Sequence, residues 1–344
     1  MKAAYLLDNK MHVGDVAEPI PGEGQVLVRT RSCGICASDS HWLHHAQDIV
    51  DYSRENGWIY GNVNLTRPIV PGHEFNGEIV GFGPGTSRRL KPGTIVTSKP
   101  LIKPVWGGDV VGHSNNYPGG FGEYMVLEED FLLEIPSGID TDLAAMAEPL
   151  AVGLRHARTG QATKQDVCVV IGCGAIGLAV IAGLRLLGAG PIIAADLAAS
   201  RRETALKMGA DIIVDPRQES PYLPQSALNG RRGNIIFECV GKPGVLDDIF
   251  RKAAPDSRVV VAGFCWENDQ VFTPGANVKR LTVIFGSRSK EDDMGIAVRS
   301  ICDDKVDVSS WVGARVGLSG VAAALGKMGN PEAPIRTVIH PAII

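Results

Sequence analysis

The sequence carries little excess charge of either sign. Its formal net charge is −4, and its lysines and arginines form no continuous stripe. Proteins that bind nucleic acid or an anionic membrane surface use such a basic stripe to meet the phosphates. We therefore expect neither nucleic acid nor a membrane surface among the partners of this chain.

A disulfide framework and a targeting segment are also missing. The seven cysteines are odd in number and scattered, unlike the dense paired sets of small secreted domains. Residues 1–10 contain an apolar run that is too short for a signal peptide. The uncharged run from Val167 to Leu184 is long enough to raise the question of a membrane span, but its glycine spacing indicates another role. These features predict a protein of the reducing cytoplasm.

The 344 residues are enough for about two domains, each with its own core. The first 150 residues contain short extended segments between Gly and Pro turns, which predict an irregular, mostly antiparallel β domain. From about 154 to 288 strands and helices alternate, which predicts a doubly wound α/β domain. A helix candidate at 318–328 and an apolar run at 335–339 could complete either domain. Strands are expected at 25–29, 78–81, 94–97, 124–127, 167–171, 191–195, 212–214, 234–238, 258–262 and 281–286, and helices near 175–188, 200–208 and 243–252.

A glycine-rich turn stands between a buried strand and a helix at Gly172-Cys-Gly-Ala-Ile-Gly177. The β-branched run 167–171 is typical of a parallel strand buried on both faces. In that setting Gly172 makes the tight turn, and Gly174 lets the backbone approach a pyrophosphate. Gly177 allows close packing of helix on strand. The pattern therefore predicts a dinucleotide site.

Asp196 ends the next apolar run, 191–195. A carboxylate at this point can bind both ribose hydroxyls of an adenosine and would repel a 2′-phosphate, which favours NAD over NADP. The alternative, a tight strand–helix turn without a ligand, leaves Asp196 unexplained. The candidate cofactor-binding residues are Gly172, Gly174, Ala175, Ile176, Gly177 and Asp196.

Potential metal ligands lie in three short motifs. Cys33 and Cys36 are spaced like half of a zinc ribbon, but no second cysteine pair follows, so a four-cysteine structural site is not available. His73 and Glu74 follow, and then Glu148. One thiolate, one imidazole and one carboxylate would leave a fourth zinc position open, which is the arrangement of catalytic sites. Spacing alone does not show that these side chains converge.

Taken together, these motifs resemble the zinc-dependent medium-chain dehydrogenases of the alcohol dehydrogenase family, and most of all the sorbitol dehydrogenase-like branch. Their order and separation match over nearly the whole chain. The resemblance implies an α/β protein with two domains. A GroES-like irregular β domain at 1–153, completed by 290–344, would be the catalytic domain. A Rossmann doubly wound parallel sheet at 154–289 would bind NAD.

The resemblance also assigns metal ligands. Cys36, His73 and Glu148 would bind the zinc directly, and Glu148 stands where liver-type alcohol dehydrogenases have a second cysteine. Glu74 would hydrogen-bond zinc-bound water or bind zinc transiently. Asp39 resembles the carboxylate that orients the histidine ligand.

Ser38 and His41 match the positions of the family's proton relay. Zinc lowers the pKa of the substrate hydroxyl, and Ser38 would pass the released proton through the cofactor ribose towards His41 and solvent. His44 and His45 compete with His41 for this role. Ala37 departs from relatives that place a basic residue there, so one contact with the pyrophosphate is expected to be missing.

Many relatives carry a second, structural zinc held by four closely spaced cysteines. This chain has no cysteine between Gly93 and Gly120. We therefore predict one zinc per chain, the catalytic one.

The segment 42–72 is longer than in many relatives and is rich in aromatic residues. A loop of that length is usually functional or disordered, and dense aromatics argue against disorder. We interpret the segment as a lid or pocket wall, with Trp42, Trp58 and Tyr60 as substrate-binding candidates. It could face the substrate or a neighbouring subunit.

The leading hypothesis is an oxidoreductase that transfers hydride from a secondary alcohol or polyol to NAD, giving a ketone or aldehyde and NADH. A zinc-free quinone or enoyl reductase of the same fold would lack the ligands that this chain keeps. A non-catalytic NAD-binding protein would have lost at least one ligand or relay residue. The expected partners are a small alcohol and further copies of the chain, as a homotetramer or homodimer.

Overall fold

The structure is a computed structural model that describes residues 1–104, 107–222, 234–286, 292–330 and 332–343. The chain divides into two compact units. The first comprises Met1–Glu148 with Val298–Ile344, and the second comprises Pro149–Ala297. The helices α3 (Ala147–Thr159) and α8 (Asp293–Cys302) contain the points where the chain passes from one unit to the other.

A seven-stranded sheet forms the centre of the first unit: six strands follow the order β14-β15-β3-β4-β5-β7, and the seventh, β6, pairs with β3. Its long strand β3 (Gln25–Gly34) pairs with three others: β4, β6 and β15. These pairings are antiparallel, as the Gly and Pro turns of this part of the sequence predict. The other strands of the sheet are β4 (Glu74–Phe82), β5 (Ile95–Ser98), β6 (Tyr124–Glu128), β7 (Leu132–Glu134), β14 (Val312–Val316) and β15 (Arg336–Ile339).

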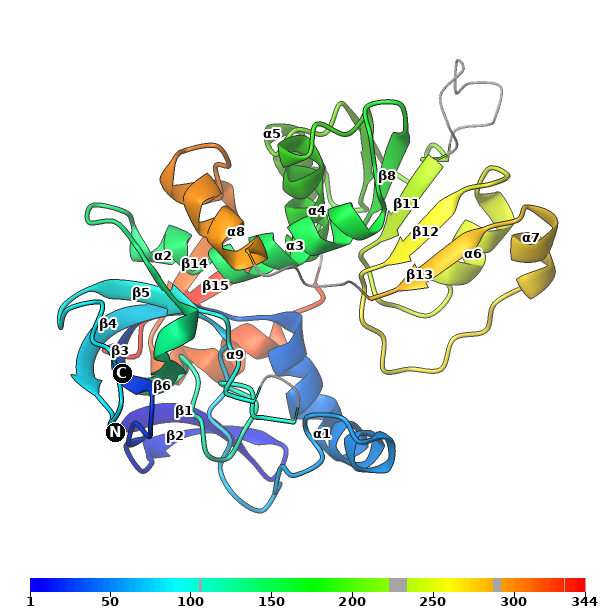
Figure 1. The fold of residues 1–344 in the computed structure, drawn as a ribbon. Coiled ribbons are helices and arrows are strands. Elements are labelled where there is room, and N and C mark those ends of the chain that lie inside the picture. The colour runs from blue at the N-terminus through cyan, green and yellow to red at the C-terminus, as the bar shows by residue number, and fades with distance from the viewer. Residues whose placement is uncertain (105–106, 223–233, 287–291, 331, 344) are drawn as a thin grey trace. The chain divides into compact units, whose positions relative to one another are not determined.

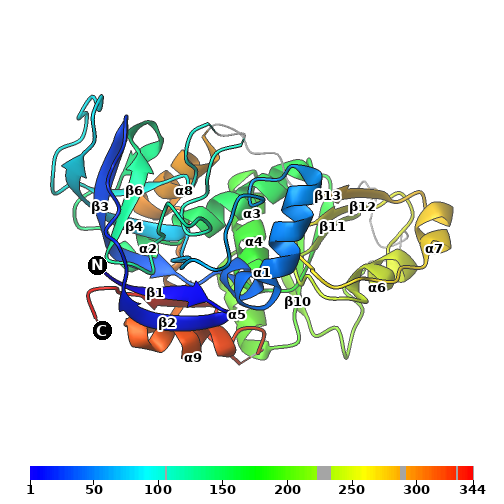
Figure 2. The same ribbon diagram turned by 90° about the horizontal axis from the view of Figure 1, so that it is seen from below.

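The core of this unit includes the fully buried Val28, Phe75, Ile79 and Met125 from the sheet and Phe121 from the turn before β6. A separate hairpin is formed by β1 (Lys2–Leu7) and β2 (Lys10–Asp15). Helix α9 (Val321–Gly326) lies against that hairpin (Figure 2). The unit also contains α1 (Ala37–Asn56) and α2 (Thr141–Ala144).

The second unit contains a six-stranded parallel sheet in the order β10-β9-β8-β11-β12-β13. From β8, the first of these strands in the chain, the order runs to β10 on one side and to β13 on the other. This is the order of the doubly wound dinucleotide-binding fold. Helices α4 and α5 cover one face of the sheet and α6 the other (Figure 1). The elements are β8 (Val167–Ile171), α4 (Ala175–Leu186), β9 (Ile192–Ala195), α5 (Ala199–Lys207), β10 (Ile212–Val214), β11 (Asn234–Glu238), α6 (Val245–Lys252), β12 (Arg258–Val261), α7 (Thr273–Val278) and β13 (Thr282–Phe285).

The uncharged run from Val167 to Leu184 is divided between β8 and α4 in this unit. It is buried because a central parallel strand and the helix over it have no solvent-facing side. Among the residues that the structure describes, no helix combines the length and the apolar character needed to cross a bilayer.

The segment 42–72 differs from its prediction in one respect. Its first part is not a loop, because α1 continues to Asn56. Trp42, Ile49 and Val50 of this helix are buried, whereas its other aromatic residue, Tyr52, is 53% exposed. The buried residues recur at helical spacing, a pattern that the aromatic content of the segment does not reveal.

The last part of the chain joins the first unit. Strand β15 pairs with β3, and β14 pairs with β15. The run expected at 335–339 is therefore an interior strand of the large sheet. Its last residues, Val338 and Ile339, pair with Gly34 and Cys33 at the end of β3, so its first residue, Arg336, lies beside the residues that follow β3.

Candidate functional site

A tight turn between β3 and α1 presents the first candidate ligand. Strand β3 ends at Gly34, and Cys36 directly precedes the first residue of α1. The Asp39 carboxylate, in the first turn of that helix, accepts a hydrogen bond of 2.8 Å from the backbone N–H of Cys36. Asp39 therefore caps the N-terminus of α1, and the Cys36 thiol projects from the turn.

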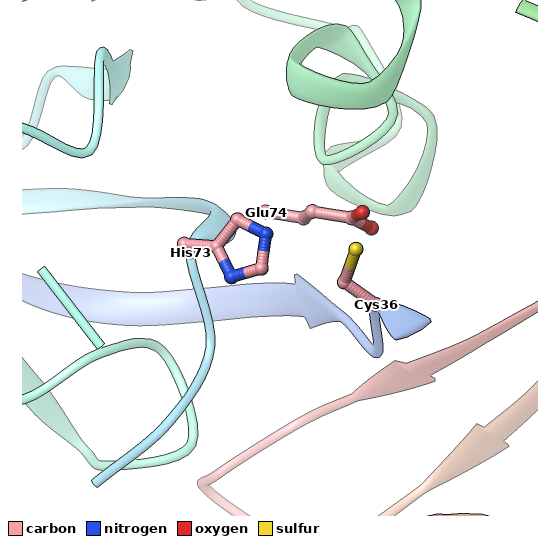
Figure 3. Close-up of side chains that lie close together, drawn as sticks. All are labelled: Cys36, His73 and Glu74. Atoms are coloured by element: carbon pink, nitrogen blue, oxygen red, sulfur yellow. The ribbon is translucent and has the colours of Figure 1, made fainter. Parts of the chain in front are cut away.

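Strand pairing brings the next two candidates to the same place. Glu74 lies opposite Gly34 in the β3–β4 ladder, and His73 precedes it. Gly34 is required here because a Cβ at this position would stand 2.5 Å from Glu74 Oε2. Ligand atoms of Cys36, His73 and Glu74 lie within 4.8 Å of one another. Figure 3 shows the thiol, one ring nitrogen and the carboxylate facing a common point.

This cluster fits a zinc ion. Glu74 is fully buried, and its Oε2 atom has no hydrogen-bond partner within the described structure, which a metal or its bound water would supply. A thiolate, an imidazole and a carboxylate are the donor types that zinc prefers. Burial opposes a positive charge on His73, but Cys36 and Asp39 outweigh it and raise the pKa of His73 well above its ordinary value. The cluster therefore attracts positive charge.

Arg336 on β15 is a residue of this site that the sequence analysis missed. Its Nη2 donates a 2.7 Å hydrogen bond to Glu74 Oε1 and lies 4.0 Å from Cys36 Sγ. Burial opposes its charge, but Glu74, Cys36 and Glu148 together raise the pKa of Arg336. The guanidinium therefore balances the charge of Glu74. The available signal was a single cation inside the apolar run 335–339.

Glu148 is not among the side chains that the described structure brings into the cluster. It lies at the start of α3, half-buried, and near enough to Arg336 to influence that side chain's charge. Its role as a zinc ligand stays a prediction.

Ser38 and His41 lie one turn apart on α1, a spacing that places them on one face of the helix. The Ser38 hydroxyl is 3.4 Å from His73 Nε2. Burial, followed by the nearby His45, lowers the pKa of His41. His41 is therefore neutral near pH 7 and able to accept a proton.

His113 is a second residue that the sequence analysis missed. It is buried, and its Nε2 atom lies 3.5 Å from Asp39 Oδ1. Its ring centre is 4.9 Å from that of His73. The available signal was a lone histidine in the glycine-rich stretch 107–120, the region where relatives hold their structural zinc.

The three aromatic candidates form a chain of ring contacts. Trp42 is only 2% exposed and packs edge-on against Tyr60 at 5.3 Å. Trp58, which is 41% exposed, also packs edge-on against Tyr60, with ring centres 5.1 Å apart. Both Trp42 and Tyr60 contact the ring of His113. These side chains lead from the surface to the metal cluster.

In the second unit, the glycine turn has the backbone geometry that a dinucleotide needs. Gly172 has φ of +92°, a conformation that favours glycine. A Cβ at Gly177 would stand 1.8 Å from the Gly172 carbonyl oxygen, whereas one at Gly174 would meet nothing within 4 Å. Gly174 thus leaves space for a ligand before α4, which begins with Ala175 and Ile176. The start of such a helix attracts phosphate.

Asp196 follows β9 and is tied to this turn. One of its carboxylate oxygens accepts a 2.7 Å hydrogen bond from the Cys173 N–H, and the other accepts one of 2.8 Å from Ala198 N–H. Each oxygen keeps a lone pair for a further donor, such as a ribose hydroxyl. The nearby Arg202 is bonded to backbone carbonyls of 196 and 197 and pairs with Asp215.

Comparison with known proteins identifies the family. Residues 22–137 match the alcohol dehydrogenase GroES-like domain, and residues 175–301 match the zinc-binding dehydrogenases. The (R,R)-butanediol dehydrogenase of Bacillus subtilis is 30% identical over 302 residues, which cover 83% of this chain and 84% of the relative. The chain belongs to the zinc-dependent medium-chain dehydrogenases of the alcohol dehydrogenase family. A Bacillus subtilis sorbitol dehydrogenase is 28% identical to this dehydrogenase, over 78% of the chain and 76% of the relative.

Solved structures share the fold of this dehydrogenase. The crystal structure of the 2R,3R-butanediol dehydrogenase from Bacillus subtilis has a TM-score of 0.81, with 23% identity over 99% of each chain. A zinc-binding dehydrogenase from Sinorhizobium meliloti, bound to NADP, has a TM-score of 0.82, also with 23% identity over 99% of each chain. The predicted α/β fold, a GroES-like domain with a Rossmann sheet, is confirmed. The dehydrogenase is therefore an oxidoreductase that acts on an alcohol or polyol.

Proposed function

We propose that this dehydrogenase oxidises a secondary hydroxyl group that has a second hydroxyl on the neighbouring carbon, using NAD and one zinc ion, and releases a ketone and NADH. The observation that carries the proposal is the buried cluster of Cys36, His73 and Glu74. Relatives named for butanediol, sorbitol, xylulose and erythritol or threitol support the substrate class.

Cys36 and His73 would hold the zinc, with Glu148 as the third ligand and Glu74 beside it. When bound, zinc supplies Lewis-acid chemistry that lowers the pKa of a substrate hydroxyl. Arg336 keeps Glu74 charge-balanced in a buried site. Asp39 Oδ1 lies 3.7 Å from one ring nitrogen of His73 and would orient the ring with its other nitrogen toward Cys36.

Ser38 would accept the hydroxyl proton, because its Oγ lies beside the ring nitrogen of His73 that faces the cluster. His41 would then take the proton on towards solvent. Its lowered pKa supports this role, since a neutral imidazole is the form that accepts a proton.

The aromatic residues Trp58 and Tyr60 would shape the entrance on the substrate side, while the buried Trp42 supports them from behind. A stacked and partly buried cluster of this kind is a firm wall rather than a mobile lid. It favours a small substrate over a bulky apolar one.

NAD is the proposed cofactor because Asp196 stands where a 2′-phosphate would have to lie. Arg202, which could otherwise neutralise that phosphate, is already paired with Asp215. The absence of cysteine between Gly93 and Gly120 supports one zinc per chain.

A homodimer or homotetramer in the cytoplasm is part of the proposal. Strand β13 is the edge of the parallel sheet, without a further neighbour among the described strands. Its last residue Phe285 is 70% exposed, and Val278 at the end of the preceding helix α7 is 79% exposed. An apolar sheet edge invites pairing with another copy. All seven cysteines are free, as in a reducing compartment. Light scattering on the purified protein measures the mass of the assembly.

The function is tested by metal analysis and an alcohol panel on the purified protein. We expect about one zinc per chain and NADH formation from butane-2,3-diol, sorbitol and xylitol. Butan-2-ol is the matched control, because it differs from butane-2,3-diol only by the second hydroxyl and should be a much poorer substrate. Preference for 1-phenylethanol would instead place Trp58 and Tyr60 in an apolar pocket. Reproducibly zinc-free protein that still reduces a quinone would refute the zinc mechanism.

A further inference from the structure

Three buried polar atoms point at one another beside the metal cluster. Asp39 Oδ1 lies 3.7 Å from His73 Nδ1 and 3.5 Å from His113 Nε2. Within the described structure none of the three atoms has a hydrogen-bond partner. The other oxygen of Asp39 is held by the N–H of Cys36. The carboxylate therefore has one oxygen left for two imidazoles.

The chemistry of these groups fits one arrangement. A carboxylate oxygen has two lone pairs and can accept from two N–H donors at once. Asp39 Oδ1 faces the ring nitrogens of both histidines, and its Oδ2 already accepts from the Cys36 N–H. The ionised carboxylate is then the acceptor, and each ring contributes a donor.

We infer that His113 is a positioning residue: it donates to Asp39, which in turn orients His73 for the metal. The inference rests on the proposed zinc site and extends it by one residue. A histidine ligand whose second nitrogen is held by a carboxylate keeps its tautomer and ring orientation. Here the carboxylate would itself be held by a second histidine.

The segment that contains His113 is bonded to the residues that directly precede His73. The N–H groups of Gly119, Gly120 and Phe121 donate to the carbonyls of residues 70–72. A Cβ at Gly112 would stand 2.9 Å from the Gly72 carbonyl oxygen, and one at Gly119 would stand 2.3 Å from it. Glycine at both positions lets the two segments touch. His113 and His73 are therefore held in a common frame.

Aromatic packing holds the ring of His113 from its other sides. Trp42 stacks on it with ring centres 5.4 Å apart, and Tyr60 contacts it edge-on at 5.9 Å. Trp42 lies one turn beyond Asp39 on α1, so a single helix carries the acceptor and the packing surface of His113. The aromatic segment thereby has a role at the metal site that is separate from contact with substrate.

Two variants separate the donor from the ring. His113→Gln places an amide N–H near the position of Nε2, and His113→Phe keeps an aromatic ring against Trp42 and Tyr60 but has no donor. His12→Phe is the control, since His12 also stacks on an aromatic ring, Tyr5, and bonds a backbone carbonyl. Each full-length variant is titrated with Zn²⁺ against a chromophoric chelator and with Co²⁺ while the visible absorption is recorded. Thermal unfolding of the metal-free chains reports on folding.

The loss of the outer partner of a histidine ligand typically weakens metal binding about 10–100-fold. We expect a loss of this size in His113→Phe, with shifted Co²⁺ absorption bands and little change in unfolding temperature. His113→Gln should retain Zn²⁺ affinity close to that of the parent, and so should the His12 control. In an Asp39→Asn background, His113→Phe should add little further loss, because the two residues act in series.

Unchanged Zn²⁺ affinity and Co²⁺ spectrum in His113→Phe would overturn the inference while leaving the zinc site standing. An equal loss in His113→Gln and His113→Phe would also overturn it, since the donor would then be irrelevant. Binding of two Zn²⁺ per parent chain and one per His113→Phe chain would make His113 a ligand of a second ion. If the parent bound no Zn²⁺ at all, the proposed function would fail first.

Discussion

The buried ion pair between Arg336 and Glu74 illustrates how single residues define this site. Glu74 is completely buried and Arg336 is 4% exposed. A buried pair of this kind contributes little beyond what apolar residues would, but loss of one partner leaves a charge without compensation. Arg336 therefore compensates the negative charge of the buried Glu74 carboxylate beside the proposed metal.

We predict that Arg336→Met destabilises the metal-free chain by about 3–5 kcal/mol, because Glu74 is left unpaired in the interior. Urea denaturation measures the change. Arg29→Met is the matched control: Arg29 pairs with Glu78 at the surface, where such pairs contribute little. Equal denaturation midpoints for the two variants would show that Glu74 does not depend on Arg336.

Proton competition at His73 predicts how zinc affinity depends on pH. The pKa of His73 in the metal-free chain is raised well above about 6.5, the ordinary histidine value. Zinc must displace this proton. As the pH is lowered, the zinc affinity should therefore begin to fall while the pH is still above 6.5. Below the raised pKa of His73 it should decline by about tenfold per pH unit. Chelator competition between pH 6 and 9 measures the slope, and a flat profile above pH 6.5 would contradict the prediction.

The same shift has the opposite sign for folding without metal. Because the folded-state pKa of His73 is raised, its protonation stabilises the folded chain fully below the unfolded value of about 6.5. That contribution is lost as the pH rises through the folded pKa. Zinc removal should therefore destabilise the protein more in mildly alkaline than in mildly acidic buffer.

At the scale of elements, both sites lie where a strand ends and a helix begins. The β3–α1 turn presents Cys36 and Asp39, and the β8–α4 turn presents Gly172 and Gly174. Such turns expose backbone N–H groups of the first helical residues. In both turns a carboxylate accepts from a backbone N–H just before the helix: Asp39 from that of Cys36, and Asp196 from that of Cys173. In the second turn a Cβ at Gly174 would meet nothing within 4 Å, which leaves space for a phosphate before α4.

We predict that alanine at the two glycines of the second turn has different effects, one on stability and the other on NAD binding. Gly177→Ala should lower the unfolding temperature markedly, because its Cβ would overlap the Gly172 carbonyl oxygen. Gly174→Ala should fold normally, since its Cβ meets no protein atom within 4 Å, and yet weaken NAD binding by obstructing the pyrophosphate. Calorimetry gives both quantities for each variant. Normal NAD affinity in Gly174→Ala would argue against a pyrophosphate at this turn.

At the scale of the whole molecule, metal and cofactor are assigned to separate units. The metal cluster belongs to the unit of residues 1–148 and 298–344, and the glycine turn belongs to the unit of residues 149–297. Each unit has its own buried core. The metal should therefore be removable without loss of cofactor binding.

We predict that Cys36→Ser abolishes zinc binding and turnover while NAD affinity stays within about twofold, because no cofactor contact is assigned to this residue. Cys33→Ala is the control. Cys33 is buried among core residues, where burial raises the pKa of its thiol, so this variant should lose some stability and keep its zinc. Tryptophan fluorescence with NAD, together with metal analysis, measures both properties. Full turnover by Cys36→Ser would refute the zinc mechanism.

Local pattern predicted most of the elements. The parallel strands were placed within one or two residues of their observed bounds, because β-branched runs between breakers are a short-range signal. The helical part of 42–72 was not predicted. Its buried residues, such as Trp42, Ile49 and Val50, recur at helical spacing among polar ones, so that no continuous apolar run marks the helix.

The sequence by itself determined the features that depend on neighbours along the chain: the glycine turn, the acid after the second strand, and the spacing of Cys36, Asp39, His73 and Glu74. It also determined the family, because these motifs recur in a specific order. Only the tertiary structure decided that Arg336 and His113 join the metal cluster and that Trp42 packs behind it. Those contacts depend on β15 pairing with β3 and on the 112–121 segment lying against residues 70–72. Pairing between distant segments is selected by the packing of the whole core. The residue pattern of either segment alone therefore does not predict which segment it pairs with.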